Sequence, residues 1–222
     1  MQYFQNGSEI EITGVAEFDL ARTFECGQCF RWNADAGGAY VGVAMGRATR
    51  IRKDGGSFYL VGTLEDFEGI WRSYFDLDRD YKAIRCALCI DDYMMEAAKY
   101  GAGIRILRQD KWEALCSFIL SQCNNIPRIK QIIEMLCRLY GEPVEFEGLT
   151  YYTFPSAEKL ASQSAEDLMP LRCGYRAPYI LEAARTVAGG LLDLEALSAG
   201  KAGDALTALK ELNGIGDKVA NC

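Results

Sequence analysis

The chain has 222 residues, half of them apolar and a quarter charged, with a net charge of −7. This length allows one large domain or two small ones, and the composition is that of an ordinary soluble globular protein. It contains no run of about 18 apolar residues and no basic, apolar leader after Met1, so neither a membrane span nor a signal peptide is predicted. A cytoplasmic location is expected, nucleoid-associated in a bacterium.

The acidic charge is concentrated in the first half of the chain. Residues 1–100 hold 11 basic and 16 acidic side chains, whereas residues 101–222 hold 13 and 15. A net negative charge argues against a nucleic-acid partner, but the near balance of the second half leaves room for a local basic face there.

The first hundred residues carry the alternating and aromatic patterns of β-strands. Strands are predicted near 9–13, 27–32, 39–45, 48–53 and 57–62, with turns at 36–38 and 54–55. A helix is predicted from Leu64 to Phe75, because its apolar side chains recur at helical spacing. The pattern indicates an antiparallel sheet with an accompanying helix.

From about residue 91 the pattern is helical. Helices are predicted at 91–100, 111–122, 126–140, 156–163, 165–170, 176–190 and 203–212. Asp110 and Ser156 stand at expected N-caps, and Ser164 precedes Asp167 as in a capping box. The chain is therefore predicted to be α+β, with an antiparallel sheet domain at 1–100 and an all-helical domain at 101–222.

Nine cysteines include two C-x-x-C pairs, Cys26 with Cys29 and Cys86 with Cys89. Two such pairs can form a zinc site, but these are much farther apart in sequence than the pairs of common zinc ribbons. Neither pair has the glycine and charged neighbours of a zinc knuckle. We therefore expect no metal and no other cofactor, with reduced and mostly buried thiols.

The last eleven residues contain a tight turn between two helical segments. Gly214 and Gly216 allow close backbone approach, and the amides of such a turn and of the following helix are suited to a phosphate oxygen. Lys218 follows directly, and a lysine that loses its proton can form a Schiff base. Alone, this motif is compatible with many phosphate-binding loops.

Three other segments accompany the turn in a specific order. They are Cys26-Gly27-Gln28-Cys29-Phe30-Arg31-Trp32, the stretch from Gly103 to Asp110 that leads into 117–129, and Phe154-Pro155-Ser156 followed by Gly174-Tyr175-Arg176-Ala177-Pro178-Tyr179. Together, the four segments resemble the 8-oxoguanine DNA glycosylase/AP lyase family of the helix-hairpin-helix superfamily. The resemblance covers nearly the whole chain.

The resemblance implies a fold and a chain length. The fold would be a TATA-binding-protein-like antiparallel sheet domain followed by a helix-hairpin-helix glycosylase domain. The family's usual chain continues past residue 222, so the helical domain is expected to be incomplete just after the hairpin. The family's aspartate, which assists departure of the base, would lie beyond this end, and weak or absent glycosylase activity is expected of residues 1–222 alone.

The resemblance also implies an enzymatic function. The protein would be a bifunctional DNA glycosylase and AP lyase of base excision repair, a monomer acting on duplex DNA that contains an oxidised purine. Lys218 would attack C1′ of the flipped-out nucleotide, expel the base and form a Schiff base that permits β-elimination. The alternative for Lys218 is a contact to DNA phosphate. Gly27 would place its carbonyl against N7–H of 8-oxoguanine, which guanine lacks; the alternative is an ordinary strand glycine.

Further positions match family residues that bind the DNA left by base flipping. Arg128 and Arg176 would bind the orphan cytosine while Tyr175 wedges beside it, although helix-surface arginines can also contact phosphates. Cys123 stands where well-known members have a gap-filling asparagine, so Asn124 or Asn125 would take that role. Cys222 would contact the base from the same helical face as Lys218.

Two other functions remain open from the sequence. One is an endonuclease III-like lyase for oxidised pyrimidines, although that group lacks the N-terminal sheet domain and carries an iron–sulfur cluster. The other is a non-catalytic DNA-binding fragment.

Overall fold

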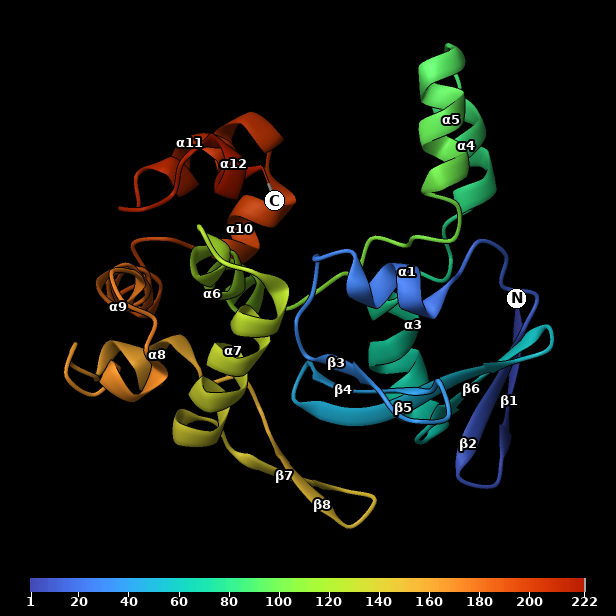
Figure 1. Ribbon diagram of the computed structural model, residues 1–222, viewed down its shortest axis with the longest axis horizontal. Coiled ribbons are helices and arrows are strands. Elements are labelled where there is room, and N and C mark those ends of the chain that lie inside the picture. The colour runs from blue at the N-terminus through green and yellow to red at the C-terminus, as the bar shows by residue number, and fades with distance from the viewer. Residues whose placement is uncertain (222) are drawn as a thin grey trace. The chain divides into compact units, whose positions relative to one another are not determined.

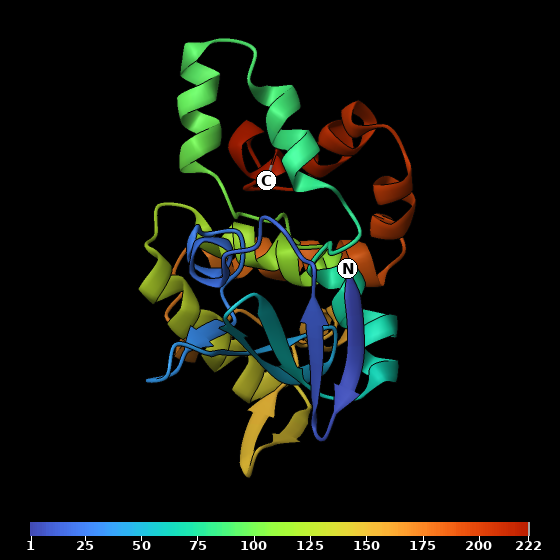
Figure 2. The same cartoon turned by 90° about the vertical axis from the view of Figure 1, so that its right-hand side faces the viewer.

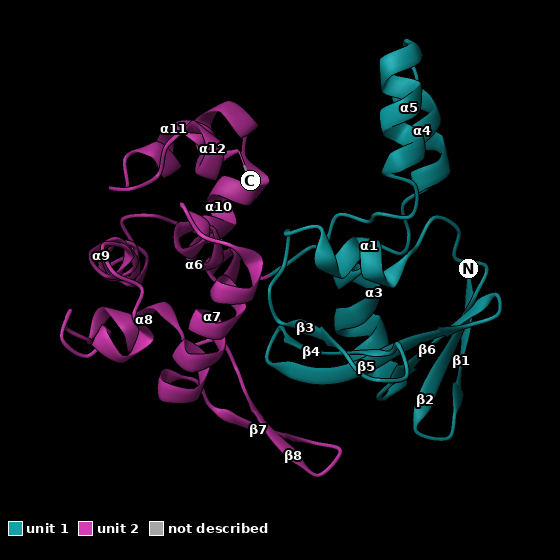
Figure 3. Ribbon diagram, viewed as in Figure 1, with its two compact units in different colours: residues 1–109 teal, residues 110–222 magenta. Residues whose placement is uncertain are grey.

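The computed structural model describes residues 1–221 and consists of two compact units, residues 1–109 and 110–222 (Figure 3). The first unit holds a six-stranded sheet with helices, and the second is mainly helical (Figure 1). The predicted α+β class, with the sheet ahead of the helices, is confirmed.

The sheet of the first unit is antiparallel throughout, in the order β1-β2-β6-β5-β4-β3. Its strands are β1 (Gln2–Asn6), β2 (Glu9–Thr13), β3 (Trp32–Ala34), β4 (Tyr40–Ala44), β5 (Arg47–Asp54) and β6 (Ser57–Val61). Four of the five predicted strands match β2, β4, β5 and β6. The fifth, predicted near 27–32, is wrong, because Gly27 adopts a left-handed φ of +88° and residues 26–31 form a turn that leads into β3.

Helical segments pack on the inner face of this sheet. They are α1 (Leu20–Glu25) and the continuous run of α2 (Leu64–Asp66), the π-helical turn η1 (Phe67–Trp71) and α3 (Arg72–Tyr74). The ring of Phe24 stacks on Trp32 at 4.4 Å, and Trp32 donates a hydrogen bond of 2.9 Å to the hydroxyl of Tyr74. This aromatic core fixes the position of β3 and of the turn that precedes it.

Residues 103–109 belong to the sheet unit, so the division falls at residue 109 rather than at the predicted residue 100. Arg105 is the reason. Its buried guanidinium donates to the carbonyls of Asp76 and Ala16, at 2.6 and 2.7 Å, and lies 4.5 Å from the centre of the Tyr81 ring. Gly103 accepts a 2.8 Å hydrogen bond from the Asp19 amide.

Two short helices of the first unit, α4 (Tyr81–Leu88) and α5 (Asp92–Tyr100), form a hairpin that stands away from the sheet (Figure 2). Neither helix contains a buried residue. The helix α5 was predicted at 91–100, whereas the short helices α4 and α1 were not, although α4 places Tyr81, Ile84 and Leu88 at helical spacing. Within residues 1–221, no helix is long and apolar enough to cross a membrane.

The second unit is built around the long helices α6 (Lys111–Ser121), α7 (Ile126–Tyr140) and α9 (Arg176–Ala188). The shorter helices are α8 (Ala157–Ala161), the 3₁₀ turn η2 (Met169–Leu171), α10 (Leu194–Ala199), α11 (Ala202–Lys210) and α12 (Asp217–Ala220). The predicted caps are present: Asp110 and Ser156 accept hydrogen bonds from the amides of Glu113 and Lys159.

Two parts of the helical prediction need correction. Residues 165–170, predicted as a helix, form a turn that leads into the 3₁₀ turn η2. The second unit is not all-helical, because β7 (Pro143–Phe146) and β8 (Leu149–Tyr152) form an antiparallel hairpin. Glu147 and Gly148 make its two-residue turn with positive φ values of 49° and 76°. A glutamate–glycine turn is a weaker hairpin signal than asparagine–glycine, which explains why the pattern did not predict it.

Candidate functional site

The junction between α6 and α7 carries Cys123, Asn124 and Asn125. Cys123 has a left-handed φ of +46°, which turns the chain sharply after α6. The Asn125 side chain caps α7 by accepting from the Arg128 amide at 3.0 Å. The side-chain nitrogen of Asn124 donates to the Leu120 carbonyl at 3.1 Å, and its side-chain oxygen accepts from the backbone amide of Asn125. Both asparagines therefore hold the junction in shape, and Cys123 is exposed beside them.

Arg176, at the first turn of α9, reaches back to this junction. Its guanidinium donates two hydrogen bonds to the Gln122 carbonyl, at 2.9 Å from Nε and closer from Nη2, and one to the Cys123 carbonyl at 3.1 Å. The same group lies 4.5 Å from the centre of the Tyr175 ring. Arg176 thus satisfies backbone carbonyls at the end of α6 while its flat face packs on a half-exposed tyrosine.

Arg128, in the first turn of α7, is held by one hydrogen bond. Its Nη2 donates to the Arg172 carbonyl at 3.0 Å, and Arg172 has a left-handed φ of +50°. Arg128 and Arg172 also line a cavity of about 430 Å³ on α7, together with Met135 and Arg138. One bond uses one of the five N–H groups of a guanidinium, so Arg128 has donors to spare for a ligand.

Cys173, three residues before Arg176, carries a buried thiol. Burial raises the pKa of Cys173, and the positive charges of Arg176 and Arg128 offset only part of this effect. Cys173 accordingly remains a neutral thiol, and the local charge at this end of α9 is that of the guanidinium groups.

The terminal hairpin packs on α9. A side chain at Gly214, where φ is +83°, would bring its Cβ to 2.4 Å from the Tyr179 ring. Asn213 donates to both carboxylate oxygens of Glu182, at 2.9 and 3.0 Å. Leu212 and Ile215 are buried on either side of the turn. These contacts pack the turn against α9.

Lys218 lies on α12, directly after this turn, and is exposed. Gly216 is the N-cap of α12, has extended backbone geometry and has open space where a side chain would point. The preceding Asp217 pairs with Lys210 of α11 at 2.6 Å, which links the two helices of the hairpin. Cys222, predicted to contact the base, lies outside the described residues.

The first unit holds the remaining predicted site residue, Gly27. The neighbouring Gln28 positions this glycine. The side-chain nitrogen of Gln28 donates to the carbonyls of Thr23 and Arg105, both at 2.8 Å, and its side-chain oxygen accepts from the backbone amide of Leu107 at 3.0 Å. The Gln28 carbonyl in turn accepts a 2.6 Å bond from Gln109. The turn at Gly27 is therefore bound to the 103–109 segment on one side and to α1 on the other.

Within the second unit, the structure brings together the predicted DNA-binding residues of the α6–α7 junction and of α9. Tyr175 also contacts Tyr179 at a ring-centre distance of 6.1 Å, and Tyr179 supports the hairpin. Sequence analysis missed Gln28 and Tyr179 as supporting residues, although both lie inside the motifs that it identified.

The cysteines need one correction. Cys29, Cys116, Cys137 and Cys173 are buried, but Cys26, Cys86, Cys89 and Cys123 are exposed, so the thiols are not mostly buried. Within residues 1–221, no group of three or more His, Cys, Asp or Glu side chains is arranged to hold a metal ion.

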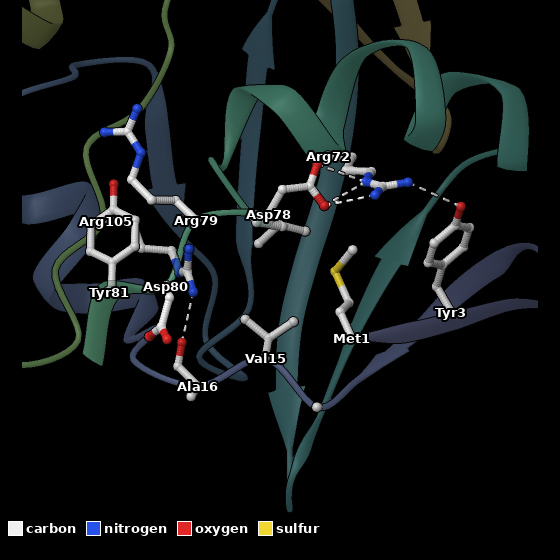
Figure 4. Close-up of a pocket in the computed structure, with 12 residues that line it drawn as sticks. Met1, Tyr3, Val15, Ala16, Arg72, Asp78, Arg79, Asp80, Tyr81 and Arg105 are labelled. Carbon is white, nitrogen blue, oxygen red and sulfur yellow. Dashed lines mark hydrogen bonds and ion pairs between the residues drawn. The ribbon is translucent and has the colours of Figure 1, made fainter. Parts of the chain in front are cut away.

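A separate cavity of about 390 Å³ lies in the first unit, between the sheet and the start of α4 (Figure 4). Its charged groups are largely paired with one another or with backbone: Arg72 makes a bidentate contact with Asp78, and Arg105 donates to Ala16. Among the described residues, none that the sequence assigned to substrate or DNA lines this cavity.

Comparison with known proteins gives one matching family model. The model of the 8-oxoguanine DNA glycosylase N-terminal domain matches residues 12–115. An N-glycosylase/DNA lyase of Saccharomyces cerevisiae is 31% identical over 93% of this chain, which spans 62% of that relative. The chain thus covers somewhat less than two thirds of this relative's length.

Two solved structures are similar over the entire chain. MBOgg1 in complex with a low-affinity DNA ligand has a TM-score of 0.95 and 45% identity, and this chain covers 78% of it. The Clostridium acetobutylicum 8-oxoguanine glycosylase/lyase, in complex with double-stranded DNA containing cytosine opposite 8-oxoguanine, has a TM-score of 0.96 and 34% identity, with 77% covered.

Proposed function

The chain belongs to the 8-oxoguanine DNA glycosylase family, and from that premise we propose that it removes 8-oxoguanine opposite cytosine from duplex DNA and then cleaves the abasic site. The partner is duplex DNA with an oxidised purine. The observation that carries the proposal is the clustering of Arg128, Tyr175 and Arg176 at the α6–α7 junction, in the unit that also holds the Lys218 hairpin.

Lys218 is the proposed nucleophile. Its neutral amine attacks C1′ of the extruded nucleotide, and the bond from C1′ to the base breaks. Opening of the sugar ring gives a Schiff base, loss of a C2′ proton expels the 3′ phosphate by β-elimination, and hydrolysis returns the lysine. The packing of the preceding turn on Tyr179 and Glu182 supports this role, because a nucleophile must be held close to its target atom.

Gly27 is the proposed point of base discrimination. 8-Oxoguanine carries a proton on N7, whereas guanine carries a lone pair, so a fixed carbonyl accepts a hydrogen bond from the first and repels the second. An unpaired buried polar group costs about 1–3 kcal/mol, enough for useful selection. The three hydrogen bonds of Gln28 support this proposal, because they fix the backbone on which such selection depends.

The two arginines are proposed to bind the cytosine left unpaired by extrusion. Arg128 makes the principal contact to this base, because its guanidinium donates one hydrogen bond to the protein, while that of Arg176 already donates to three backbone carbonyls. Tyr175, half exposed and packed on Arg176, enters the base stack beside the gap.

A panel of duplexes tests the function. The purified chain is incubated with 8-oxoguanine opposite each of the four bases, with an oxidised pyrimidine, and with a preformed abasic site. Because weak or absent excision is expected of residues 1–222 alone, the panel is also run with a form of the chain extended toward the length of its relatives. In that longer form we expect strand cleavage at 8-oxoguanine to be strongest opposite cytosine, and cleavage at the abasic site. Cleavage only at the oxidised pyrimidine would support an endonuclease III-like lyase instead, and binding to an abasic analogue without cleavage anywhere would support a DNA-binding fragment.

A further inference from the structure

The second C-x-x-C pair plays no part in the proposed glycosylase chemistry. Cys86 lies in the last turn of α4, and Cys89 is the residue that caps this helix. Both thiols are exposed and free. They stand near the outer end of the α4–α5 hairpin, the part of the first unit that projects from the sheet (Figures 1 and 2).

The backbone brings the two cysteines within reach of each other. The Cys89 amide donates to the Cys86 carbonyl at 3.2 Å, which closes a four-residue turn. Residues at the two ends of such a turn have Cα atoms less than about 7 Å apart, and a disulfide needs about 4.4–6.8 Å. Cys89 has already left helical geometry, with φ −80° and ψ 66°, and its exposed thiol donates one 3.2 Å hydrogen bond to the Arg85 carbonyl, which the thiol must give up to reach Cys86.

We propose that Cys86 and Cys89 form a reversible dithiol–disulfide site that takes hydrogen peroxide as its oxidant. The sulfur of one cysteine attacks the peroxide and breaks the O–O bond, which gives a sulfenic acid, and the released hydroxide takes the thiol proton as water. The sulfur of the other cysteine then attacks the sulfenic sulfur, forms the S–S bond and expels a second water. Both electrons that reduce the peroxide come from the two sulfurs.

The surroundings explain why this disulfide would be reducible again. Neither α4 nor α5 buries a residue, so the hairpin does not shield the bond from an attacking thiol. Exposed disulfides have higher reduction potentials than buried structural ones and are the labile class. The site therefore cycles with the thiol and peroxide content of its surroundings, independently of the proposed reaction on DNA.

The first C-x-x-C pair is a matched internal control. Cys26 and Cys29 have the same spacing, but Cys29 is buried, with 3% exposed. Their sulfurs point to different backbone carbonyls, Cys26 to Thr23 at 3.4 Å and Cys29 to Phe24 at 3.7 Å. A peroxide therefore reaches only one member of this pair.

Trypsin separates the two pairs into peptides 86–99 and 23–31, each with two cysteines. The reduced chain is treated with hydrogen peroxide and unfolded, and its remaining thiols are blocked with N-ethylmaleimide. The chain is then digested, and the masses of the peptides are measured by mass spectrometry. We expect peptide 86–99 to carry no maleimide, because its two cysteines are joined in a disulfide, and to carry two maleimides when dithiothreitol is added before the block. The fraction of peptide 23–31 that is closed by a disulfide should be roughly tenfold smaller. The Cys86→Ser and Cys89→Ser variants should each lose the closed form.

Three results would overturn the proposal. Peptide 86–99 could keep two maleimides at peroxide doses that oxidise Cys26, or it could carry sulfinic acid without passing through the closed form. Peptides 23–31 and 86–99 could also close to the same extent, which would show that exposure and turn geometry do not decide the reaction.

Discussion

Gly214 lies so close to Tyr179 that a methyl group on the glycine would sit 2.4 Å from the tyrosine ring. The contact joins the turn before Lys218 to α9, the helix that begins with Arg176. It shows that the glycine is needed for packing within the protein, in addition to any approach to DNA.

Replacement of Gly214 by alanine should destabilise the protein. The positive φ of 83° and the overlap with Tyr179 both oppose a side chain, so we expect the free energy of unfolding to fall by about 2–3 kcal/mol. Chemical denaturation measures this change. The matched control is Gly216→Ala, where φ is −94° and a Cβ meets open space, and it should change stability by less than about 1 kcal/mol. Equal losses in the two variants would contradict the packing role of Gly214.

Replacement of Arg176 should mainly lower stability, whereas replacement of Arg128 should mainly lower the preference for cytosine opposite the lesion. Arg176→Ala leaves carbonyls at the end of α6 without their donor and should lower the free energy of unfolding by about 1–3 kcal/mol. Arg128→Ala removes one hydrogen bond and should cost less than about 1.5 kcal/mol, yet it should cause the larger loss of preference for cytosine. Denaturation and single-turnover excision opposite cytosine and adenine measure these quantities. A wild-type preference in Arg128→Ala would exclude Arg128 as the reader of the orphan base.

Gln28 should affect base choice more than strand cleavage. Gln28→Ala removes three hydrogen bonds that fix the turn at Gly27, so excision of 8-oxoguanine should fall at least about tenfold while cleavage of a preformed abasic site stays within about twofold. Gln5→Ala is the matched control, because the Gln5 amide also donates to three backbone carbonyls, but on β1. A parallel loss of both activities in Gln28→Ala would show a general folding defect.

Acid should weaken the cap formed by Ser164 and Asp167. The Asp167 carboxylate accepts two hydrogen bonds from Ser164, one from its backbone amide and one from its hydroxyl. Both lower the pKa of Asp167 below the ordinary 3.8, and the bond from the amide has the larger effect. A carboxyl with a lowered pKa in the folded state stabilises the protein above its unfolded pKa and loses this effect as pH falls through the folded value. The stability difference between wild type and Asp167→Asn should therefore shrink from about pH 6 to about pH 3. A difference that stays constant over this range would contradict the assigned cap.

Much of the fold follows from local signals. The alternating strands β2, β4, β5 and β6 and the capped helices α6 and α7 could be predicted because their apolar periodicity and their caps agree. The turn at Gly27 could not, since an aromatic run reads as a strand unless the left-handed glycine is known. The β7–β8 hairpin is short and exposed, and its glutamate–glycine turn is a weak signal. The helix α4 could have been predicted, because Tyr81, Ile84 and Leu88 recur at helical spacing.

For the site, the motifs identified the residues but not their supports. Lys218, Arg128 and Arg176 stand in recognisable segments, whereas the hydrogen bonds of Gln28 depend on residues 105–107, far away in sequence. The hydrogen bonds from Arg176 to the Gln122 carbonyl at the end of α6 are likewise tertiary contacts. Such contacts form only once the chain has folded, so a linear motif can contain a supporting residue without revealing what it supports.

The most direct test of the central claim is borohydride trapping of Lys218 on a duplex with 8-oxoguanine opposite cytosine. Reduction of a Schiff base joins enzyme and DNA covalently, and the joined species is resolved by denaturing electrophoresis. Lys210→Gln is the matched control, because Lys210 lies on the other helix of the same hairpin and pairs with Asp217. With the chain extended toward the length of its relatives, we expect an adduct in the wild type and in Lys210→Gln and none in Lys218→Gln. An adduct of undiminished yield in Lys218→Gln would contradict the account.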